Sequence, residues 1–255
     1  MTLASSLLEV VSQVDVFLFP MFGTDERGLV KAKYGTTPIV LNKEILQAIP
    51  SRVPLFIGWA RQALKSAADM IGIHIVETAN LSDLAILNSI PSAEGALQMA
   101  MEETKVTLHG SESFVIGLGR TGWTIARMLQ GIGAHVTGVA RKPADLARAA
   151  EMGFKAVHVS DLEERIGEAE IVFNTAPALV LDRVILERMS KDAVIVDLAS
   201  IPGGTDFEYA QMLGIKALLA PGLPGIVAPK TAGRILAQVY PQLILRQLST
   251  VNTSV

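Results

Sequence analysis

The chain has 255 residues, of which 50% are hydrophobic and 18% are charged, and its formal net charge is −3 at pH 7. The acidic balance argues against a nucleic-acid partner, and the absence of cysteine excludes disulfides, thiolate catalysis and cysteine-ligated metal. The mean hydropathy is high, at +0.40, yet no stretch has the ~18 uninterrupted apolar residues of a membrane span. The four isolated histidines show no metal-ligand spacing, and the N-terminus does not resemble a signal peptide. A parallel sheet covered by helices on both faces explains such a composition, so we expect a cytoplasmic α/β enzyme.

The first 88 residues alternate between short apolar runs and amphipathic stretches and predict a smaller α/β domain, 1–88. Its strands are expected at 14–19, 38–41, 55–57 and 74–76, and its helices at 3–11, 43–48, 59–70 and 81–87. Residues 89–109 are expected to form an interdomain helix, because the stretch 88–95 leads into a helix that ends near Glu103. A terminal helix at 231–248 is expected to return to the first domain.

Residues 110–230 show a more regular alternation of strands and helices with short connections. Six strands are expected, at 113–116, 135–140, 155–159, 170–174, 193–198 and 215–219. Strands separated by helices pair in parallel through right-handed crossovers. The sequence therefore predicts a two-lobed α/β protein, in which a doubly wound parallel-sheet Rossmann domain follows the smaller α/β domain.

A glycine fingerprint, GLGRTG, follows the first of these six strands and opens a helix. Gly117 permits a tight turn, Gly119 lets the backbone approach a pyrophosphate, and Gly122 lets the helix and the strand pack closely. Arg120 and Thr121 open the helix, whose first N–H groups offer an anion site. A glycine-rich turn without a ligand is the alternative, but the surrounding strand-helix-strand unit favours a pyridine-nucleotide site.

Two cations follow the second strand, at the point where NAD-binding proteins place a carboxylate that hydrogen-bonds the ribose hydroxyls. Here Arg141 and Lys142 stand about 20 residues beyond the fingerprint. An arginine can bind a 2′-phosphate through two N–H groups, so we interpret the pair as an NADP site. A pair of solvated surface charges is the alternative.

The loops after the later strands end at the carboxyl edge of the sheet, where open α/β folds bind ligands. Thr175 and Pro177, after the fourth strand, and Ala199, after the fifth, are therefore expected to face the nicotinamide half of the cofactor or the substrate. Asp197 has two open interpretations, as a functional carboxylate or as a structural residue that caps a loop.

Two segments rich in glycine and proline, 200–207 and 220–231, contain too many turn-forming residues for regular elements. Each follows a predicted strand, so we interpret both as rigid binding loops at the same edge of the sheet. Lys230 is the one cation of the second segment. It is a candidate partner for a substrate carboxylate, or else a surface lysine beside a helix.

Several of these segments together resemble one family, the A subunits of dipicolinate synthase from endospore-forming bacteria. The blocks that carry the resemblance are NSIPSAEG at 88–95, GLGRTGWTIA at 117–126, DLAS at 197–200, PGGTDF at 202–207 and GIKALLAPGLPGIVAPKT at 214–231. The resemblance extends over nearly the whole chain, and the last block is long enough to be specific.

The resemblance implies an activity, a partner and a location. It implies NADP-dependent oxidation of dihydrodipicolinate to dipicolinate during sporulation, in the cytoplasm of the mother cell and within an oligomeric, heteromeric complex. The partner would be the B subunit, which resembles a flavoprotein, so any flavin belongs to that subunit. A small dicarboxylate substrate would require hydroxyl or cationic groups, and the candidates are Ser89, Ser200, Thr205 and Lys230.

The chain departs from the family in one respect. Members begin with a further strand-helix unit that contains a glycine-rich turn, whereas Met1 here leads directly to the helix expected at 3–11. We therefore expect the smaller domain to be truncated at its N-terminus.

Two other functions stay open. One is a two-lobed dehydrogenase of the alanine dehydrogenase or methylenetetrahydrofolate dehydrogenase type, which also carries a proline- and glycine-rich segment resembling 223–231. The other is a non-catalytic NADP-binding regulatory subunit, because the sequence shows no clear His-Asp or Lys-Asp constellation. Glu94 and Lys230 are the candidate catalytic residues, and Glu94 is equally ordinary as a helix-start glutamate stabilised by the helix dipole.

Overall fold

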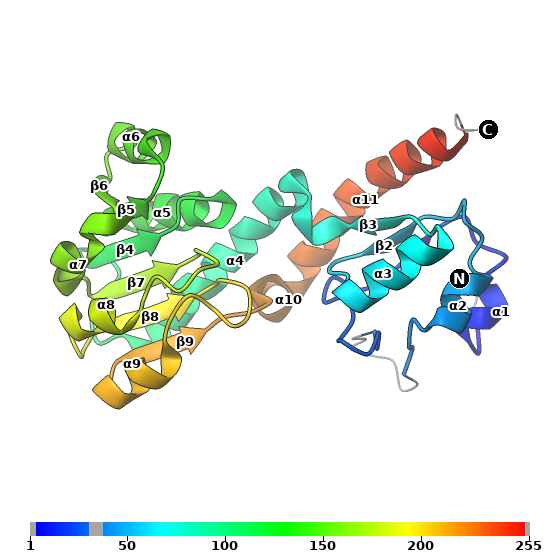
Figure 1. Ribbon diagram of the computed structural model, residues 1–255. Coiled ribbons are helices and arrows are strands. Elements are labelled where there is room, and N and C mark those ends of the chain that lie inside the picture. The colour runs from blue at the N-terminus through cyan, green and yellow to red at the C-terminus, as the bar shows by residue number, and fades with distance from the viewer. Residues whose placement is uncertain (1–3, 31–37, 253–255) are drawn as a thin grey trace. The chain divides into compact units, whose positions relative to one another are not determined.

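The computed structural model describes residues 4–30 and 38–252. It divides into two compact units: unit 1 comprises Met1–Ala85 and Arg234–Val255, and unit 2 comprises Ile86–Gly233. The segment 89–109, expected to join two domains, therefore belongs to unit 2. Two helices shown in Figure 1, α4 (Ser82–Glu103) and α11 (Pro229–Asn252), contribute residues to both units.

Unit 1 contains a small parallel sheet with the strand order β1-β2-β3. All three residues of β2, the central strand, are buried, as expected for a strand covered on both faces. The strands are β1 (Phe17–Leu18), β2 (Leu55–Ile57) and β3 (Ile75–Glu77), and the other elements are α1 (Leu7–Val10), α2 (Lys43–Ala48), α3 (Gln62–Ile71) and the 3-10 helix η1 (Thr78–Asn80).

Three elements predicted in unit 1 do not have the expected extent: among the residues described, one strand is absent, and a helix and a strand are shorter. The strand predicted at 38–41 is wrong, because Val40 forms only an isolated bridge with Leu29. The N–H of Leu41 donates to the carbonyl oxygen of Gly28 at 2.9 Å, so this segment pairs with a turn instead of joining the sheet. The helix predicted at 3–11 is the single turn α1, with Leu3 outside the described residues, and the strand predicted at 14–19 shortens to β1.

Unit 2 contains a six-stranded parallel sheet with the strand order β6-β5-β4-β7-β8-β9. This is the order of a dinucleotide-binding sheet, whose direction of winding reverses between β4 and β7. The predicted fold class is therefore confirmed. The strands are β4 (Glu112–Ile116), β5 (His135–Ala140), β6 (Lys155–His158), β7 (Ile171–Asn174), β8 (Val194–Asp197) and β9 (Lys216–Leu219).

Helices cover both faces of this sheet (Figure 1). On one face, Ile125, Ala149 and Leu223 share a hydrophobic core with the strands, and they come from α5 (Arg120–Ile132), α6 (Pro143–Glu151) and α10 (Leu223–Val227). The opposite core is closed by α7 (Leu162–Arg165), α8 (Arg183–Arg188) and α9 (Phe207–Leu213), with the 3-10 helices η2 (Val159–Asp161) and η3 (Ile166–Glu168) beside α7. The apolar composition is explained by these two cores.

Part of the segment 220–231, predicted as a loop, is helical, because Leu223–Val227 forms α10. Residues 88–95 lie inside α4, which begins at Ser82, earlier than the interdomain helix expected at 89–109. A Cβ on Gly95 would lie 3.1 Å from the side chain of Val227, so α10 rests directly on α4 at this glycine. The tertiary contact overrides the turn preference of the proline and glycine residues.

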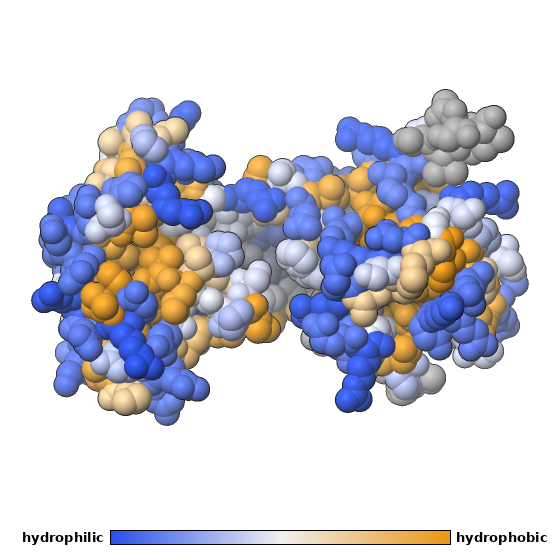
Figure 2. Space-filling view, viewed as in Figure 1, coloured by the Kyte–Doolittle hydropathy of each residue, from blue (hydrophilic) through white to orange (hydrophobic). Residues whose placement is uncertain are grey.

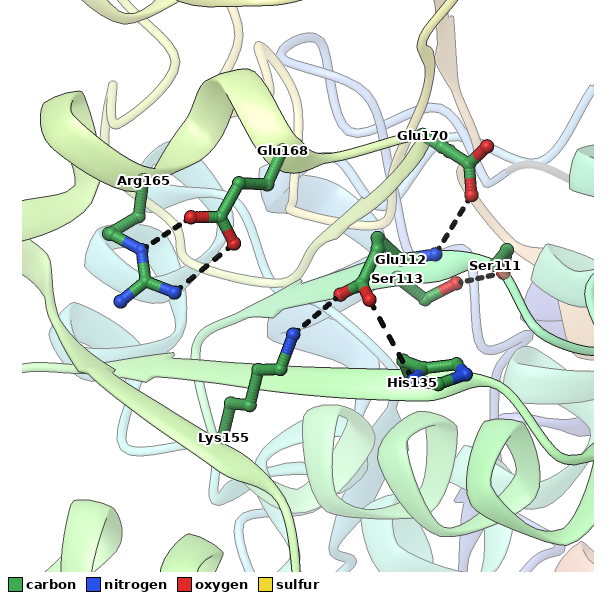
Figure 3. Close-up of polar contacts among 8 residues, drawn as sticks. All are labelled: Ser111, Glu112, Ser113, His135, Lys155, Arg165, Glu168 and Glu170. Atoms are coloured by element: carbon green, nitrogen blue, oxygen red, sulfur yellow. Dashed lines mark hydrogen bonds and ion pairs between the residues drawn. The ribbon is translucent and has the colours of Figure 1, made fainter.

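A polar cluster joins the strands at the amino edge of the large sheet, as Figure 3 shows. Glu112 begins β4, and its carboxylate lies 2.9 Å from Nζ of Lys155 and 3.7 Å from Nδ1 of His135, the first residues of β6 and β5. The N–H of Glu112 donates to Oε2 of Glu170, just before β7, at 2.9 Å. These contacts tie together the starts of four neighbouring strands, at the edge opposite the glycine fingerprint, so we assign them a structural role.

No helix in the described part of the chain is long and apolar enough to cross a membrane. Apolar residues nevertheless reach the surface of both units, where Figure 2 shows orange areas among blue ones. The exposed large apolar side chains include Met70 in unit 1 and Met212 in unit 2.

Phe173 tests how much the central strands contribute to stability. Its side chain is fully buried in β7, so Phe173→Ala leaves a cavity in the core. We expect the free energy of unfolding to fall by about 3–5 kcal/mol, measured by urea denaturation followed by circular dichroism. Met212→Ala on the exposed surface of α9 is the control and should change it by less than about 0.5 kcal/mol. A similar small change in the Phe173 variant would contradict the packing described.

Candidate functional site

The glycine fingerprint lies where β4 ends and α5 begins. Gly117 has a φ of +88°, which favours glycine, and its N–H donates to the carbonyl oxygen of Val139 in β5 at 2.9 Å. A Cβ on Gly122 would collide with the carbonyl oxygen of Gly117, so the first turn of α5 can meet the strand end only with glycine there. A Cβ on Gly119 would meet no atom of the described residues within 4 Å. The backbone at Gly119 is therefore open to a ligand.

Thr175 fixes the fingerprint turn from the neighbouring strand. It follows β7, and its Oγ1 donates to the carbonyl oxygen of Gly117 at 2.8 Å. Its backbone N–H donates to the carbonyl oxygen of Ile116 at 2.8 Å. Thr175 therefore shapes the turn, and its hydroxyl proton is already used by the protein. Pro177 is exposed in the same loop.

Arg141 and Lys142 follow β5 at the same edge of the sheet. Both are exposed, and neither side chain forms an ion pair or hydrogen bond with the residues that the structure describes. The pairing of Val139 with Ile116 places these cations beside the fingerprint, on the side away from β7. Nε2 of His158, at the end of β6, lies 3.2 Å from the backbone carbonyl oxygen of Arg141. No motif in the sequence indicated this contact.

Asp197 makes the largest set of hydrogen bonds described at this edge. The residue is fully buried at the end of β8. Its carboxylate accepts hydrogen bonds from Oγ1 of Thr205 at 2.6 Å, the N–H of Gly204 at 2.9 Å, the N–H of Ala199 at 2.9 Å and Nδ2 of Asn174 at 3.0 Å. Four donors satisfy the carboxylate, so we interpret Asp197 as the residue that ties the 199–205 loop to β7. Sequence reasoning missed Asn174 as its partner.

This network decides which loop residues keep a donor for a ligand. Thr205 gives its hydroxyl proton to Asp197, and Ala199 gives its backbone N–H to the same carboxylate. Thr205 keeps only acceptor lone pairs, which do not suit a substrate carboxylate. Ser200 is exposed, and its hydroxyl has no hydrogen-bond partner among the described residues. Of these three predicted binding residues, Ser200 therefore keeps its side-chain donor available.

The two predicted site residues on α4 differ in their surroundings. Ser89 is buried, and its Oγ lies 2.6 Å from the carbonyl oxygen of Ile86 and 2.6 Å from Oγ1 of Thr124 in α5. It links α4 to the fingerprint helix instead of opening to a substrate. Glu94 is exposed in the middle of α4, so its interpretation as a helix-start glutamate is wrong. Lys230 is exposed in the first turn of α11, as the expected helix-flanking lysine would be.

Large apolar side chains are exposed on three consecutive segments at the carboxyl edge of the large sheet. Leu179 follows β7, Ile201 follows β8, and Ile226 lies in α10 after β9; they are 61%, 73% and 67% exposed. Apolar side chains with a few polar groups among them are typical of sites for small ligands. We call these three residues the apolar rim.

The Asp197 network predicts an effect on stability that is separate from ligand binding. Thr205→Val removes the hydroxyl donor, so we expect the free energy of unfolding to fall by about 1.5–3 kcal/mol in the absence of ligand. Thr205→Ser keeps the donor and should recover most of this loss. Thermal denaturation of the three proteins measures the difference, and equal stability of the valine and serine variants would contradict this role.

Family models match both parts of the chain. Residues 1–79 match the N-terminal domain of the dipicolinate synthase A subunit. Residues 88–200 match the NAD binding domain of D-isomer specific 2-hydroxyacid dehydrogenases. The second match covers the fingerprint, Arg141 and Lys142, and the strand ends that carry Thr175 and Asp197.

Relatives at high identity extend over most of the chain. It is 44% identical over 232 residues to the dipicolinate synthase A subunit of Bacillus subtilis (strain 168), which covers 91% of this chain and 78% of the relative. The crystal structure of the dipicolinate synthase A chain from Bacillus subtilis has a TM-score of 0.92 at 41% identity, over 97% of this chain and 84% of that one. The A subunit from Bacillus halodurans has a TM-score of 0.88 at 43% identity, over 91% and 79%. The chain therefore belongs to the family of dipicolinate synthase A subunits and carries an NAD(P)-binding dehydrogenase domain.

Proposed function

We propose that the chain is the NADP-dependent oxidoreductase subunit of a dipicolinate synthase and oxidises dihydrodipicolinate to dipicolinate during sporulation. Family membership supports the reaction, and one observation supports the cofactor. Two cations without partners among the described residues, Arg141 and Lys142, follow β5 beside an open fingerprint turn. We propose further that the chain works in the mother-cell cytoplasm with a flavoprotein-like B subunit, on which any flavin is bound.

The residues at the end of β4 and β5 fit NADP. Gly119 leaves room against the backbone. Arg120 and Thr121 begin α5, and the first N–H groups of a helix have no intrahelical acceptor, so they suit a pyrophosphate. Arg141 and Lys142 suit a 2′-phosphate, which a carboxylate at the same place would repel.

The proposed reaction removes two hydrogens from a dihydropyridine ring. When bound, NADP⁺ supplies the hydride acceptor. One ring C–H bond breaks and its hydrogen leaves with the electron pair as hydride, while a second hydrogen leaves as a proton, and the ring becomes aromatic. The chain's part is to hold the ring carboxylates through Ser200 and Lys230 and to limit the access of water through the apolar rim. Glu94 and Lys230 are the candidate catalytic residues; with Lys230 holding a carboxylate as a cation, Glu94 is the candidate proton acceptor.

A non-catalytic NADP-binding subunit is the second candidate function. The hydrogen bonding of Asp197 favours this function. The buried carboxylate at the edge of the site accepts hydrogen bonds from four protein donors, so its oxygens are already occupied and it is not a candidate proton acceptor. Reconstitution with the B subunit separates the two functions.

The cofactor preference is measured by nucleotide binding to the purified chain. We expect NADPH to bind more tightly than NADH, and Arg141→Ala to weaken NADPH binding at least about 10-fold while leaving NADH binding unchanged, because a charge-assisted contact is lost. Arg148→Ala, which removes an exposed arginine from α6, is the matched control and should have no effect. Equal affinities of the unmodified chain for NADPH and NADH would contradict the assignment.

Product formation is measured by incubating dihydrodipicolinate and NADP⁺ with the chain and its candidate B subunit. Dipicolinate and NADPH are expected in equal amounts, and Lys230→Ala should raise KM for the substrate because a carboxylate partner is lost. If NADPH binds but no product forms with the B subunit present, the chain has the non-catalytic function.

A further inference from the structure

The loops at the carboxyl edge of the small sheet in unit 1 are joined by backbone hydrogen bonds. The N–H of Phe19 donates to the carbonyl oxygen of Phe56 at 2.8 Å, and that of Gly58 donates to the carbonyl oxygen of Pro20 at 3.4 Å. The N–H of Ala79 donates to the carbonyl oxygen of Gly58 at 3.2 Å. These bonds connect the segments that follow β1, β2 and β3, so the three loops form one base.

At two glycines of these loops, the backbone of one loop lies directly against the backbone of another. A Cβ on Gly58 would collide with the carbonyl oxygen of Met21. A Cβ on Gly23, whose φ is +67°, would collide with the carbonyl oxygen of Trp59. The backbone of segment 21–23 therefore packs directly against the backbone of 58–59.

The side chains that stand on this base are large, aromatic and exposed. Phe22 is 58% exposed, and Trp59 is 45% exposed. Neither ring stacks on another aromatic ring within the ranges 4–30 and 38–252. Leaving such large apolar side chains in water forgoes the free energy that their burial would contribute. The carboxyl edge of a parallel sheet is also where open α/β folds bind their ligands.

A cationic side chain stands close to Trp59 in the sequence. Arg61 stands two residues after Trp59, and its side chain is half-exposed. Its Nε lies 3.6 Å from Oε1 of Glu26, which is itself largely exposed. Exposed pairs of this kind are weak, so an anionic ligand can replace Glu26. A guanidinium can bind a carboxylate through two parallel N–H groups.

We infer that Phe22 and Trp59 form a binding platform for a planar ring that carries carboxylate groups, with Arg61 as the partner of one carboxylate. The flat rings supply stacking area on a rigid base, and the cation selects for negative charge. This inference rests on the proposed function and deepens it: unit 1, in which the sequence indicated no site residue, carries a site of its own for a ring dicarboxylate.

The chain contains two tryptophans, which makes a direct test possible. Trp123 stacks near Phe154 in unit 2, and Trp123→Phe keeps an aromatic ring there. In this background Trp59 is the single tryptophan, and we expect dipicolinate to quench its emission in a saturable manner when excitation avoids the absorption of dipicolinate.

The strength of binding should depend on the ring at position 59. Trp59→Leu is expected to weaken dipicolinate binding, measured by calorimetry, roughly 5- to 100-fold, and Trp59→Phe should keep most of the affinity. Met70→Ala, at an exposed site of α3 in the same unit, is the matched control and should change nothing. Benzene-1,3-dicarboxylate should bind, whereas cyclohexane-1,3-dicarboxylate should bind more weakly because its ring is not flat.

Three results would overturn the inference. They are no binding of dipicolinate to the unmodified chain, equal binding to the Trp59→Leu variant, and a Trp59→Leu variant that loses the B subunit but keeps its affinity for dipicolinate. The last result would make the aromatic pair a protein-docking surface. The proposed function is judged separately: a Trp59→Leu variant that still prefers NADPH and forms product leaves the proposed function standing, whichever of these three results is found.

Discussion

The arrangement of the glycine fingerprint depends on one atom, the carbonyl oxygen of Gly117. Gly122 approaches it from α5 so closely that a Cβ would collide with it, and Oγ1 of Thr175 donates to it at 2.8 Å from the end of β7. One contact comes from α5, which follows β4, and the other comes from the end of β7. The direction of winding of the sheet reverses between these two strands. The start of the helix, the end of the strand and the next loop are therefore held in one arrangement. A larger residue at 122 would push the helix away and move the anion site with it.

A second constraint acts on the other side of that loop. Asp197 is a buried carboxylate that pairs with no cation in 4–30 or 38–252, and such a group is stable only when its oxygens are hydrogen-bonded. Its four donors come from β7 and from the 199–205 loop, so the carboxylate holds the loop against the sheet. With its ends fixed, the loop exposes Ser200 and Ile201. The buried carboxylate of Asp197 thus holds the loop, while the side chains of Ser200 and Ile201 stay exposed.

The charges of unit 2 are used differently at the two edges of its sheet. At the amino edge, Glu112 pairs with Lys155 and lies near His135, and these contacts hold the strands together. At the carboxyl edge, Arg141 and Lys142 have no partner within the part of the chain that the structure describes. Paired charges are largely satisfied by the protein itself, whereas unpaired cations beside an open turn attract an anion. This difference separates the charges that hold strands together from the charges that the described residues leave unpaired.

The sequence by itself determined the order of strands and helices in unit 2 and the place of the fingerprint, because strand alternation and the spacing of Gly117, Gly119 and Gly122 are local properties. It also located Arg141 and Lys142 at a strand end. Only the tertiary structure showed that the hydroxyl protons of Thr175 and Thr205 serve the protein and that the buried hydroxyl of Ser89 contacts α5. It also decided that Leu223–Val227 is helical and that Phe22 and Trp59 share one base. The physical reason is the same in each case: a donor, a turn or a ring receives its role from a partner on another element, and the sequence near that residue does not contain the partner.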